Sequence, residues 1–411
     1  MSLRTVEEHL TEILAAVRPV DCAEVALATA AGRTLAQPVR ARVDIPVFDN
    51  SAMDGFAVRF ADVSAASAVV PAILRVVADL PAGSELDPPI AAGEAARIMT
   101  GSPLPSAADT VVPFEDTVGG LADSLREVAV RAVPRGAGAH VRRRGGDAHV
   151  GDEIVPAGVR LGALQLAAAA AAGVARVSVF RAPRVVVLST GTELASPGAA
   201  LRRGQIPESN SVLLAELARE AGADIVHVGS VGDDDADFRD ALTARADADV
   251  VITSGGVSAG AYEVVKNVLG DVASISFVTV AMQPGRPQGF GILPTGALFF
   301  GLPGNPVSSA VSFEAFIRPA LLALQGRSAL HRPILRLTAA EGWSAPPGRR
   351  QYLPAAIDRG GPAPWRVRPA TAGGSASHLA GGLARAEAYA IVPAGIERVE
   401  AGDGVDVMLV S

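Results

Sequence analysis

Three segments of the sequence combine glycine with hydroxyl or amide side chains, a pattern that suits the binding of an anion. Each follows a short apolar run that predicts a buried strand, and they are residues 189–193 (STGTE), 253–258 (TSGGVS) and 301–306 (GLPGNP). Glycine lets backbone N–H groups approach phosphate oxygens, and hydroxyl side chains add donors. One such turn often only connects two elements, but three at one sheet edge predict an anion site. The candidate binding residues are Ser189, Thr190, Gly191, Ser254, Gly255, Gly256, Ser258, Gly304 and Asn305.

Carboxylates accompany this predicted anion site. Glu193 ends the first turn, residues 233–235 (DDD) follow Gly232, and Glu263 follows the second turn. Acidic side chains beside a phosphate would repel it unless a divalent cation lay between them. The candidate metal ligands are therefore Glu193, Asp233, Asp234 and Glu263. The alternative is that residues 233–235 only cap the helix that begins near Ala236. The turns match neither the P-loop signature nor the dinucleotide-binding fingerprint.

The N-terminal half carries three more polar segments. Residues 48–57 (FDNSAMDGFA) place an acid, an amide and a hydroxyl between two aromatic side chains, and residues 98–105 (IMTGSPLP) lead from a strand into a hydroxyl-containing turn. Residues 142–147 (RRRGGD) are the densest basic run of the chain. Because guanidinium groups grip oxyanions, this run is a candidate oxyanion gate. Two Asx-type turns in the first segment and a solvated loop in the third are the alternatives.

The elements that would position the anion-binding turns alternate between strand and helix from residue 176 onward. Buried strands are expected at 184–188, 225–228, 250–252 and 297–300, and helices at 212–220, 235–246, 262–268 and 306–324. Alternation of this kind predicts a largely parallel sheet with helices on both faces. In such a sheet, ligands bind outside the carboxyl ends of the strands, where the three turns lie.

The rest of the chain predicts smaller units of other kinds. Thr5 and Glu8 have the spacing of a capping box for a first helix, and residues 161–172 predict another helix. Short apolar runs broken by Gly and Pro predict β-rich structure elsewhere. We therefore predict a multidomain α/β and β protein. Its parts are a helical linker domain (1–47 and 148–175), a β-rich module (48–147), a three-layer α/β domain (176–326) and a small C-terminal β-barrel (327–411).

Composition restricts the class of protein. A chain of 411 residues predicts two to four domains, and 49% hydrophobic with 19% charged residues excludes general disorder. A net charge of −7 argues against nucleic acid as the main partner. One cysteine, Cys22, excludes an intrachain disulfide framework. Apolar runs interrupted by charges and a charged N-terminus predict a cytoplasmic protein without a membrane segment.

The order of the polar segments resembles the molybdopterin molybdenumtransferase family, which is similar to the E domain of gephyrin. The resemblance runs from end to end, and its markers are residues 50–55 (NSAMDG), 99–101 (MTG), 143–147 (RRGGD), 189–191 (STG), 254–258 (SGGVS), 284–287 (PGRP) and 301–306 (GLPGNP). It implies an elongated homodimer of four-domain subunits. It also implies that molybdate enters the dithiolene of adenylylated molybdopterin, with release of AMP and help from a divalent cation such as Mg²⁺. The adenylyltransferase that makes this substrate is a candidate partner.

The resemblance also implies roles for individual residues. Asp54 and Thr100 match the functional acid and hydroxyl of the β-rich module, and Arg142 and Asp147 match the Arg-rich loop. Further matches to the family's pocket are Glu193, Asp233 or Asp234, Arg286, Pro303 and Pro306, together with Ser375 or Ser377 near the C-terminus. The reaction class agrees, because cleavage of a phosphoanhydride needs clamped phosphates, a cation and a positioned water more than a protein nucleophile.

This sequence departs from the family pattern near the predicted oxyanion contacts. Thr279 and Gln283 replace lysines of many members, Arg286 stands where lysine is common, and Glu263 is the nearest acid after the second turn. Three other functions stay open from the sequence. They are the adenylyltransferase activity, which needs only residues 176–326; a non-catalytic scaffold; and a nucleotide-binding hydrolase unrelated to molybdenum.

Overall fold

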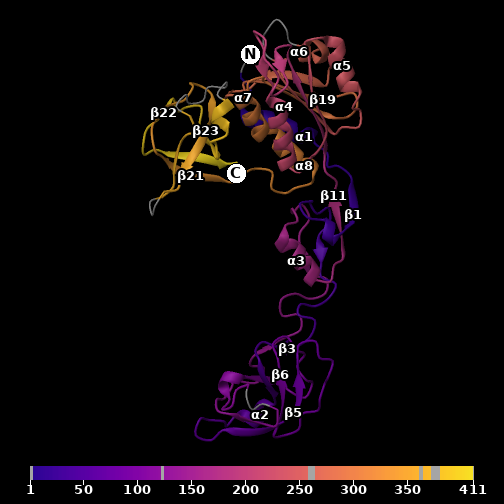
Figure 1. The fold of residues 1–411 in the computed structure, drawn as a ribbon, viewed down its shortest axis with the longest axis vertical. Helices are drawn as coiled ribbons and strands as arrows, with labels where there is room; N and C mark the ends of the chain where they lie inside the picture. The colour runs from indigo at the N-terminus through magenta and orange to yellow at the C-terminus, as the bar shows by residue number, and fades with distance from the viewer. Residues whose placement is uncertain (1–2, 122–124, 258–263, 361–363, 372–379, 411) are drawn as a thin grey trace.

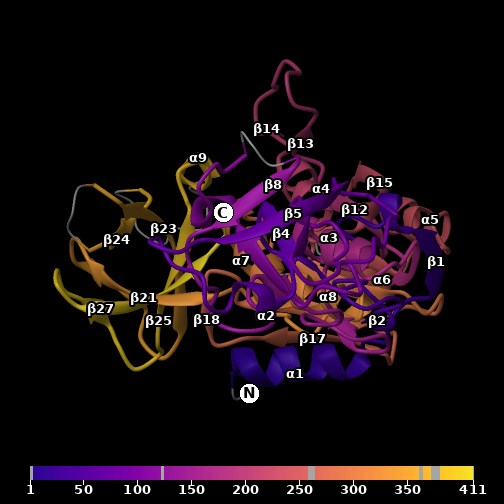
Figure 2. The ribbon, with the colours of Figure 1, turned by 90° about the horizontal axis from the view of Figure 1, so that it is seen from below.

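The protein is an elongated chain of four structural parts, described by a computed structural model over residues 3–121, 125–257, 264–360, 364–371 and 380–410. An α/β domain and a C-terminal barrel lie side by side at one end, and a β-rich module lies at the far end (Figure 1). A small linker unit separates them (Figure 1). Figure 2, seen along the long axis, shows the barrel beside the α/β domain.

A six-stranded sheet forms the centre of the α/β domain, in the order β15-β12-β16-β20-β19-β17. The first four strands are parallel, as predicted, and β19 and β17 are antiparallel to their neighbours. In β12, Val185 and Val187 pack into one core and Val186 and Leu188 into another, so the strand is covered on both faces. The bounds are β15 (Asp224–Val231), β12 (Arg184–Thr190), β16 (Val250–Ser254), β20 (Leu298–Leu302), β19 (Pro287–Ile292) and β17 (Ile275–Thr279).

Helices cover both faces of this sheet, as the alternating pattern predicts. One face carries α1 (Val6–Ala16), α4 (Asn210–Glu220) and the continuous helical run of α7 (Pro306–Ser312), a π-helical turn (Phe313–Ile317) and α8 (Arg318–Leu324). The other face carries α5 (Asp235–Thr243) and α6 (Val264–Leu269). The helical run Pro306–Leu324 is long and apolar enough to cross a membrane, with a mean hydropathy of 1.4, but 83% of its most apolar 18-residue stretch is buried inside the molecule. It is the core helix of this domain.

Two elements lie in different parts from those that the sequence predicts. Helix α1 begins with the predicted capping box, but Val6, Ile13 and Val17 pack into the core of the α/β domain rather than into the linker domain. Strand β11 (Arg176–Phe180) pairs with β1 (Cys22–Ala26), so it belongs with the linker unit rather than with the α/β sheet. Both differences are long-range contacts, which local periodicity does not encode.

The linker unit and the β-rich module are built around separate cores. The linker unit packs α3 (Ala163–Ala171) against β1, β11, β2 (Val39–Arg40) and β10 (Glu153–Val155). The module has a five-stranded sheet of order β7-β4-β6-β5-β8. Its elements are β3 (Asn50–Ser51), β4 (Gly55–Val58), α2 (Phe60–Val63), β5 (Ala72–Leu80), β6 (Glu94–Ile98), β7 (Thr110–Pro113), β8 (Glu127–Val130) and β9 (Val141–Arg142).

The C-terminal part is a closed barrel, as predicted. Its strands run β23-β24-β21-β27-β25, and β25 pairs back with β23 to close the ring. Strand β18 (Met282–Gln283) of the α/β domain pairs in parallel with the start of β23, which joins the two domains by backbone hydrogen bonds. The bounds are β21 (Ile334–Ala339), β22 (Trp343–Ser344), β23 (Arg350–Asp358), β24 (Arg366–Pro369), α9 (Ala380–Leu383), β25 (Ala388–Val392), β26 (Arg398–Val399) and β27 (Gly404–Leu409).

A buried histidine on α1 makes the stability of this domain depend on pH. His9 is 1% exposed, and its ring lies against Phe316 at a centroid distance of 4.8 Å. Burial, with a smaller contribution from Arg4, lowers the pKa of His9 to about 4. Below about pH 6.5, His9 therefore binds a proton in the unfolded chain but not in the folded chain. The free energy of unfolding falls as the pH is lowered from 6.5 to 4.

We expect the His9→Phe variant to lose this pH-dependent component. Above pH 7 the two proteins should differ only by packing, because His9 is neutral in both the folded and the unfolded state. At pH 5 the wild type should have lost about 2 kcal/mol relative to the variant, from ~1.4 kcal/mol for each pH unit below the unfolded pKa. Calorimetric unfolding of both proteins at pH 7.5 and pH 5 measures the difference. Parallel pH dependence in the two would show that His9 does not titrate on unfolding.

Candidate functional site

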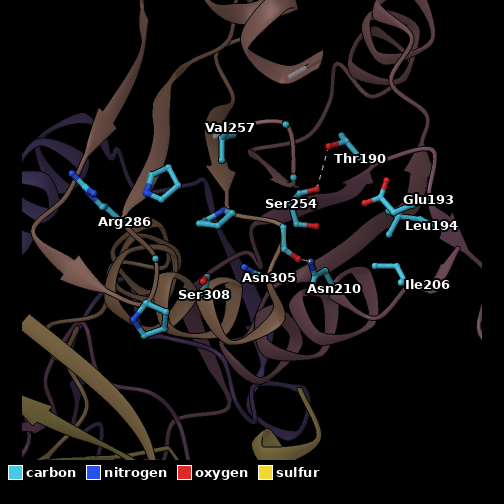
Figure 3. Close-up of a pocket in the computed structure, with 18 of the residues that line it drawn as sticks. Thr190, Glu193, Leu194, Ile206, Asn210, Ser254, Val257, Arg286, Asn305 and Ser308 are labelled. Carbon is cyan, nitrogen blue, oxygen red and sulfur yellow. Dashed lines mark hydrogen bonds between the residues drawn. The ribbon is translucent and has the colours of Figure 1, made fainter. Parts of the chain in front are cut away.

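A cavity of about 1170 Å³ opens at the carboxyl ends of β12, β16 and β20, where the three predicted turns meet (Figure 3). Each strand delivers one turn to the cavity because the strands are parallel neighbours. The residues that line it are Thr190, Gly191, Thr192, Glu193, Leu194, Ile206, Asn210, Asp233, Ser254, Gly255, Gly256, Val257, Met282, Gln283, Pro284, Gly285, Arg286, Pro287, Pro303, Gly304, Asn305, Ser308 and Arg349.

The glycines of these turns are required by their surroundings. Gly255 has φ +94°, and a Cβ there would lie 2.6 Å from the backbone oxygen of Thr190. Gly191 has φ +146°, a backbone conformation that L side chains rarely adopt, and the carboxylate of Glu193 in the same turn lies close to it. The glycine at position 255 therefore lets the end of β16 approach the backbone of Thr190 at the end of β12.

Glu193 and Asp233 supply the acidic groups of the cavity wall. Oδ2 of Asp233 accepts hydrogen bonds from the backbone N–H of Thr192 at 3.1 Å and from its hydroxyl at 2.9 Å. Asp234 instead caps α5, because its Oδ1 accepts from the N–H groups of Ala236 and Asp237. The capping alternative thus holds for Asp234, whereas Asp233 is the aspartate of the cavity. Among the described residues, no three His, Cys, Asp or Glu side chains are grouped closely enough to hold a metal ion.

Two arginines supply the basic groups of the wall, and Figure 3 draws Arg286 on the opposite side of the cavity from Glu193. Arg286 lies in the turn between β18 and β19. Arg349 comes from the C-terminal part, which the pairing of β18 with β23 brings to the cavity. Arg349 was not predicted from the sequence, although two consecutive arginines, Arg349 and Arg350, directly precede an apolar strand there. Gln283 lines the cavity, and Thr279, at the exposed end of β17, does not.

The third turn joins the cavity to α4 and α7. Nδ2 of Asn210 donates to the backbone oxygen of Gly304 at 2.6 Å, and Oγ of Ser309 donates to that of Pro303 at 2.7 Å. Pro303, Gly304 and Asn305 line the cavity, whereas Pro306 is the first residue of α7 and lies outside the lining. These bonds fix the turn between two helices.

A buried glutamate that the sequence reading missed lies behind the wall. Glu208 is 7% exposed, and its Oε1 accepts from Oγ of Ser189 at 2.7 Å and from the N–H of Ser211 at 2.8 Å. The hydroxyl of Ser211 donates to Oε2. Ser189, a predicted binding residue, is 1% exposed and outside the lining, so it acts behind the cavity rather than in it. The only sequence signal for Glu208 was indirect, because its partner Ser189 belongs to the STG turn.

A second cluster forms in the β-rich module, where three predicted segments come together. Oδ1 of Asp54 accepts from the backbone N–H of Thr100 at 2.6 Å and from its hydroxyl at 2.7 Å. These bonds hold the pKa of Asp54 below its usual range. Strand β3 pairs with β9 so that Asn50 lies opposite Arg142. Asp54, Thr100 and Arg142 are all exposed.

The predicted oxyanion gate of three arginines is corrected by the structure. The guanidinium of Arg143 donates to Asp49 at 2.6 Å, and that of Arg144 donates to Asp44. Both side chains therefore brace the connection to the linker unit, and of the three only Arg142 makes no ion pair among the described residues. Asp147 is exposed and borders a second, acidic cavity of about 490 Å³ with Asp152, Glu153 and others.

The two clusters do not meet within one chain. The 1170 Å³ cavity lies in the α/β domain and the Asp54 cluster lies in the β-rich module, with the linker unit between them (Figure 1). Four predicted site residues, Ser258, Glu263, Ser375 and Ser377, fall outside the described residues.

Comparisons with known proteins cover the whole chain. Family models match residues 4–173 (MoeA N-terminal region, domain I and II), 186–323 (probable molybdopterin binding domain) and 336–410 (MoeA C-terminal region, domain IV). Molybdopterin molybdenumtransferase 2 of Mycobacterium tuberculosis is 43% identical over 98% of this chain and 99% of its own. The molybdopterin molybdenumtransferase of Nostoc is 35% identical over 92% and 86%. A crystal structure of the molybdopterin biosynthesis MoeA protein from Pyrococcus horikoshii covers 99% of both chains with a TM-score of 0.80 and 30% identity.

Proposed function

This chain belongs to the MoeA family, and on that premise we propose that its large cavity is where molybdenum is inserted into molybdopterin. The chain is accordingly a transferase of molybdenum cofactor biosynthesis that acts at the final step. The observation that carries the assignment to this cavity is its wall, with three glycine turns at one sheet edge between two carboxylates and two arginines. The scaffold and adenylyltransferase alternatives do not explain why a relative named as a molybdopterin molybdenumtransferase matches 98% of this chain.

The proposed substrates are adenylylated molybdopterin and molybdate, with AMP released. Both carry oxyanions, and the wall offers Arg286 and Arg349 as guanidinium partners for them. The turns add backbone groups and hydroxyl side chains. Cleavage of the phosphoanhydride then rests on clamped phosphates and a positioned water, and it needs no protein nucleophile.

A Mg²⁺ ion would fit between the substrate phosphate and the acidic side of the wall. Mg²⁺ is usually held by one or two carboxylates together with phosphate oxygens and water, and Glu193 and Asp233 are carboxylates of that kind. When bound, the ion would neutralise charge that develops on the phosphate oxygens. The two donors from Thr192 hold the Asp233 carboxylate against the first glycine turn at the cavity wall. We keep Asp234 out of the ligand set because it caps α5.

A second copy of this chain would complete the site. Asp54, Thr100 and Arg142 form a polar, exposed cluster that lies away from the cavity of the same chain. In a homodimer, the β-rich module of one subunit can reach the cavity of the other. Two-fold symmetry then makes this contact twice, once at each cavity. We propose a cytoplasmic homodimer with two such shared sites, supplied with its substrate by the molybdopterin adenylyltransferase.

Molybdate-dependent release of AMP tests the proposed function. The full chain is incubated with adenylylated molybdopterin, MgCl₂ and molybdate, and both AMP and active molybdenum cofactor are assayed. We expect both products to require the protein and the divalent cation, so excess EDTA should abolish them and MgCl₂ should restore them. AMP formation that ignores both molybdate and EDTA would contradict the proposed reaction.

The half-saturating molybdate concentration should depend on Arg286. Gln283 of the cavity wall is uncharged where the family resemblance implies a lysine, so Arg286 should carry more of the anion affinity, whereas Thr279 lies outside the cavity. We expect Arg286→Ala to raise that concentration at least several-fold, the scale of one charge-assisted hydrogen bond. Gln283→Lys adds an ammonium group to the cavity wall and should lower it.

Molybdate titrations of both variants distinguish this from a structural role. The exposed Arg366 of β24, outside the cavity, supplies the matched control Arg366→Ala, which should leave the titration unchanged. If Arg286 only braces the turn between Pro284 and Pro287, its variant should melt at a lower temperature with unaltered molybdate dependence.

A further inference from the structure

The network around Glu208 connects the elements that form one side of the cavity. Glu208 lies two residues before α4 and binds Ser211 in the first turn of that helix. It also binds Ser189 in β12, and Oγ of Ser189 lies 3.1 Å from Oγ of Ser254 in β16. Of these four residues only Ser254 lines the cavity, with 2% of its surface exposed. A chain of hydrogen bonds therefore runs from a buried carboxylate to one hydroxyl of the cavity wall.

The direction of this chain follows from the number of protons in it. A glutamate carboxylate has only acceptors, and a serine hydroxyl has a single proton. The proton of Ser189 is donated to Oε1 of Glu208. The bond between Ser189 and Ser254 then has one possible donor, the hydroxyl of Ser254. Ser254 Oγ is left with lone pairs alone for any ligand atom that it meets.

We infer that the hydroxyl of Ser254 determines specificity by accepting a hydrogen bond from an N–H or O–H group of the substrate. Glu208 and Ser189 are positioning residues, because they take up the proton of Ser254 and leave its oxygen as an acceptor. This inference rests on the proposed function of the cavity. It reverses the expectation that the hydroxyl at residue 254 donates to an anion, because an ionised phosphate or molybdate oxygen has no proton to offer. The oxyanions then lie elsewhere, toward Arg286 and Arg349.

Two parts of adenylylated molybdopterin carry suitable donors, the amino and ring N–H groups of the pterin and the hydroxyl and amino groups of the adenosine. Calorimetric titration in MgCl₂ with three probes separates these sources from the anion. The probes are pterin, AMP and inorganic pyrophosphate, of which the last, when ionised, has no donor. The proteins are the wild type, Ser254→Ala and Ser189→Ala. Ser276→Ala, a serine of β17 outside the cavity, is the matched control.

We expect Ser254→Ala to weaken binding of one donor-bearing probe, pterin or AMP, by about 2- to 10-fold, the effect of one neutral hydrogen bond. Pyrophosphate binding should stay within about twofold of the wild type, because the missing hydroxyl donated nothing to it. In turnover, the KM for adenylylated molybdopterin should rise while the half-saturating molybdate concentration stays the same. A loss of pyrophosphate affinity of about tenfold or more in Ser254→Ala would overturn the inference, since it would identify Ser254 as a donor to the anion.

Ser189→Ala tests the positioning step, because it removes the group that takes the proton of Ser254. The hydroxyl can then turn this proton toward the cavity, so the ratio of donor-probe affinity to pyrophosphate affinity should fall. A purely structural role of Ser189 would weaken all probes alike and leave the ratio unchanged. Neutron diffraction of the perdeuterated wild type gives a direct answer, since the deuteron of Ser254 should point to Ser189. A deuteron pointing into the cavity would overturn the inference.

Failure of the inference and failure of the proposed function give different results. A wild type that binds none of the three probes and releases no AMP would contradict the function itself. A wild type with normal AMP release, in which Ser254→Ala leaves every probe and the KM unchanged, would overturn the inference alone.

Discussion

Replacing Glu193 with glutamine should lower molybdate-dependent AMP release by about 100-fold or more, the scale at which a preorganised charged group acts on a transition state. The carboxylate of Glu193 lies over Gly191 on the wall of the cavity, where it can hold a divalent cation against the substrate phosphate. Glutamine keeps the volume and one oxygen but removes the charge. Single-turnover release of AMP in MgCl₂ measures the effect.

The fold and the binding of the pterin should survive this change. The side chain of Glu193 is exposed and does not pack in the core, so the substitution should leave the free energy of unfolding nearly unchanged. Glu216→Gln is the matched control, because Glu216 is an exposed glutamate of α4 that pairs with Arg219 outside the cavity. Turnover of the Glu193 variant at the wild-type rate would remove Glu193 from the proposed site, whereas an equal loss in the Glu216 variant would point to a general effect of charge.

The sequence predicts the parallel part of the central sheet well because its strands are short, continuous apolar runs. Strand β12 needs apolar residues on both faces, and the run RVVVL shows that need directly. Strand β19 (PQGFGI) is different, since its glycines are set by neighbours: a Cβ on Gly291 would lie 2.1 Å from the backbone oxygen of Ser274. These glycines are required by contacts with a neighbouring strand, which the local sequence does not show. The two antiparallel strands were therefore not predicted.

The same distinction separates the predicted from the missed parts of the site. Glycines and hydroxyls directly after three strands are local signals, and their turns do meet at one cavity. Partners far apart in sequence left no such signal. Asp49 and Arg143 are 94 positions apart, so the acid that engages this arginine could not be read from the basic run. Arg349 reaches the cavity only because β23 pairs with β18.

Mixing two inactive variants should restore activity if each site is shared between subunits. Asp54→Asn damages the β-rich module and Glu193→Gln damages the cavity, and each homodimer should release AMP at least about 100-fold more slowly than the wild type. In a mixed dimer, the intact cavity of one subunit can meet the intact module of the other, while the second site carries both changes. Random exchange of equal amounts gives half mixed dimers, so we expect about a quarter of the wild-type activity.

A second mixture separates this recovery from an effect of concentration or refolding. Thr100→Ala damages the same module as Asp54→Asn, because its hydroxyl and backbone N–H are both bonded to Asp54 in the parent chain. Mixed dimers of these two variants have a damaged module at each site, so they should stay inactive. Mixed dimers are verified by differential tagging and size-exclusion chromatography before the AMP assay. If verified dimers of the Asp54 and Glu193 variants show no recovery, the cavity works with residues of its own chain, and the distant Asp54 cluster needs another explanation.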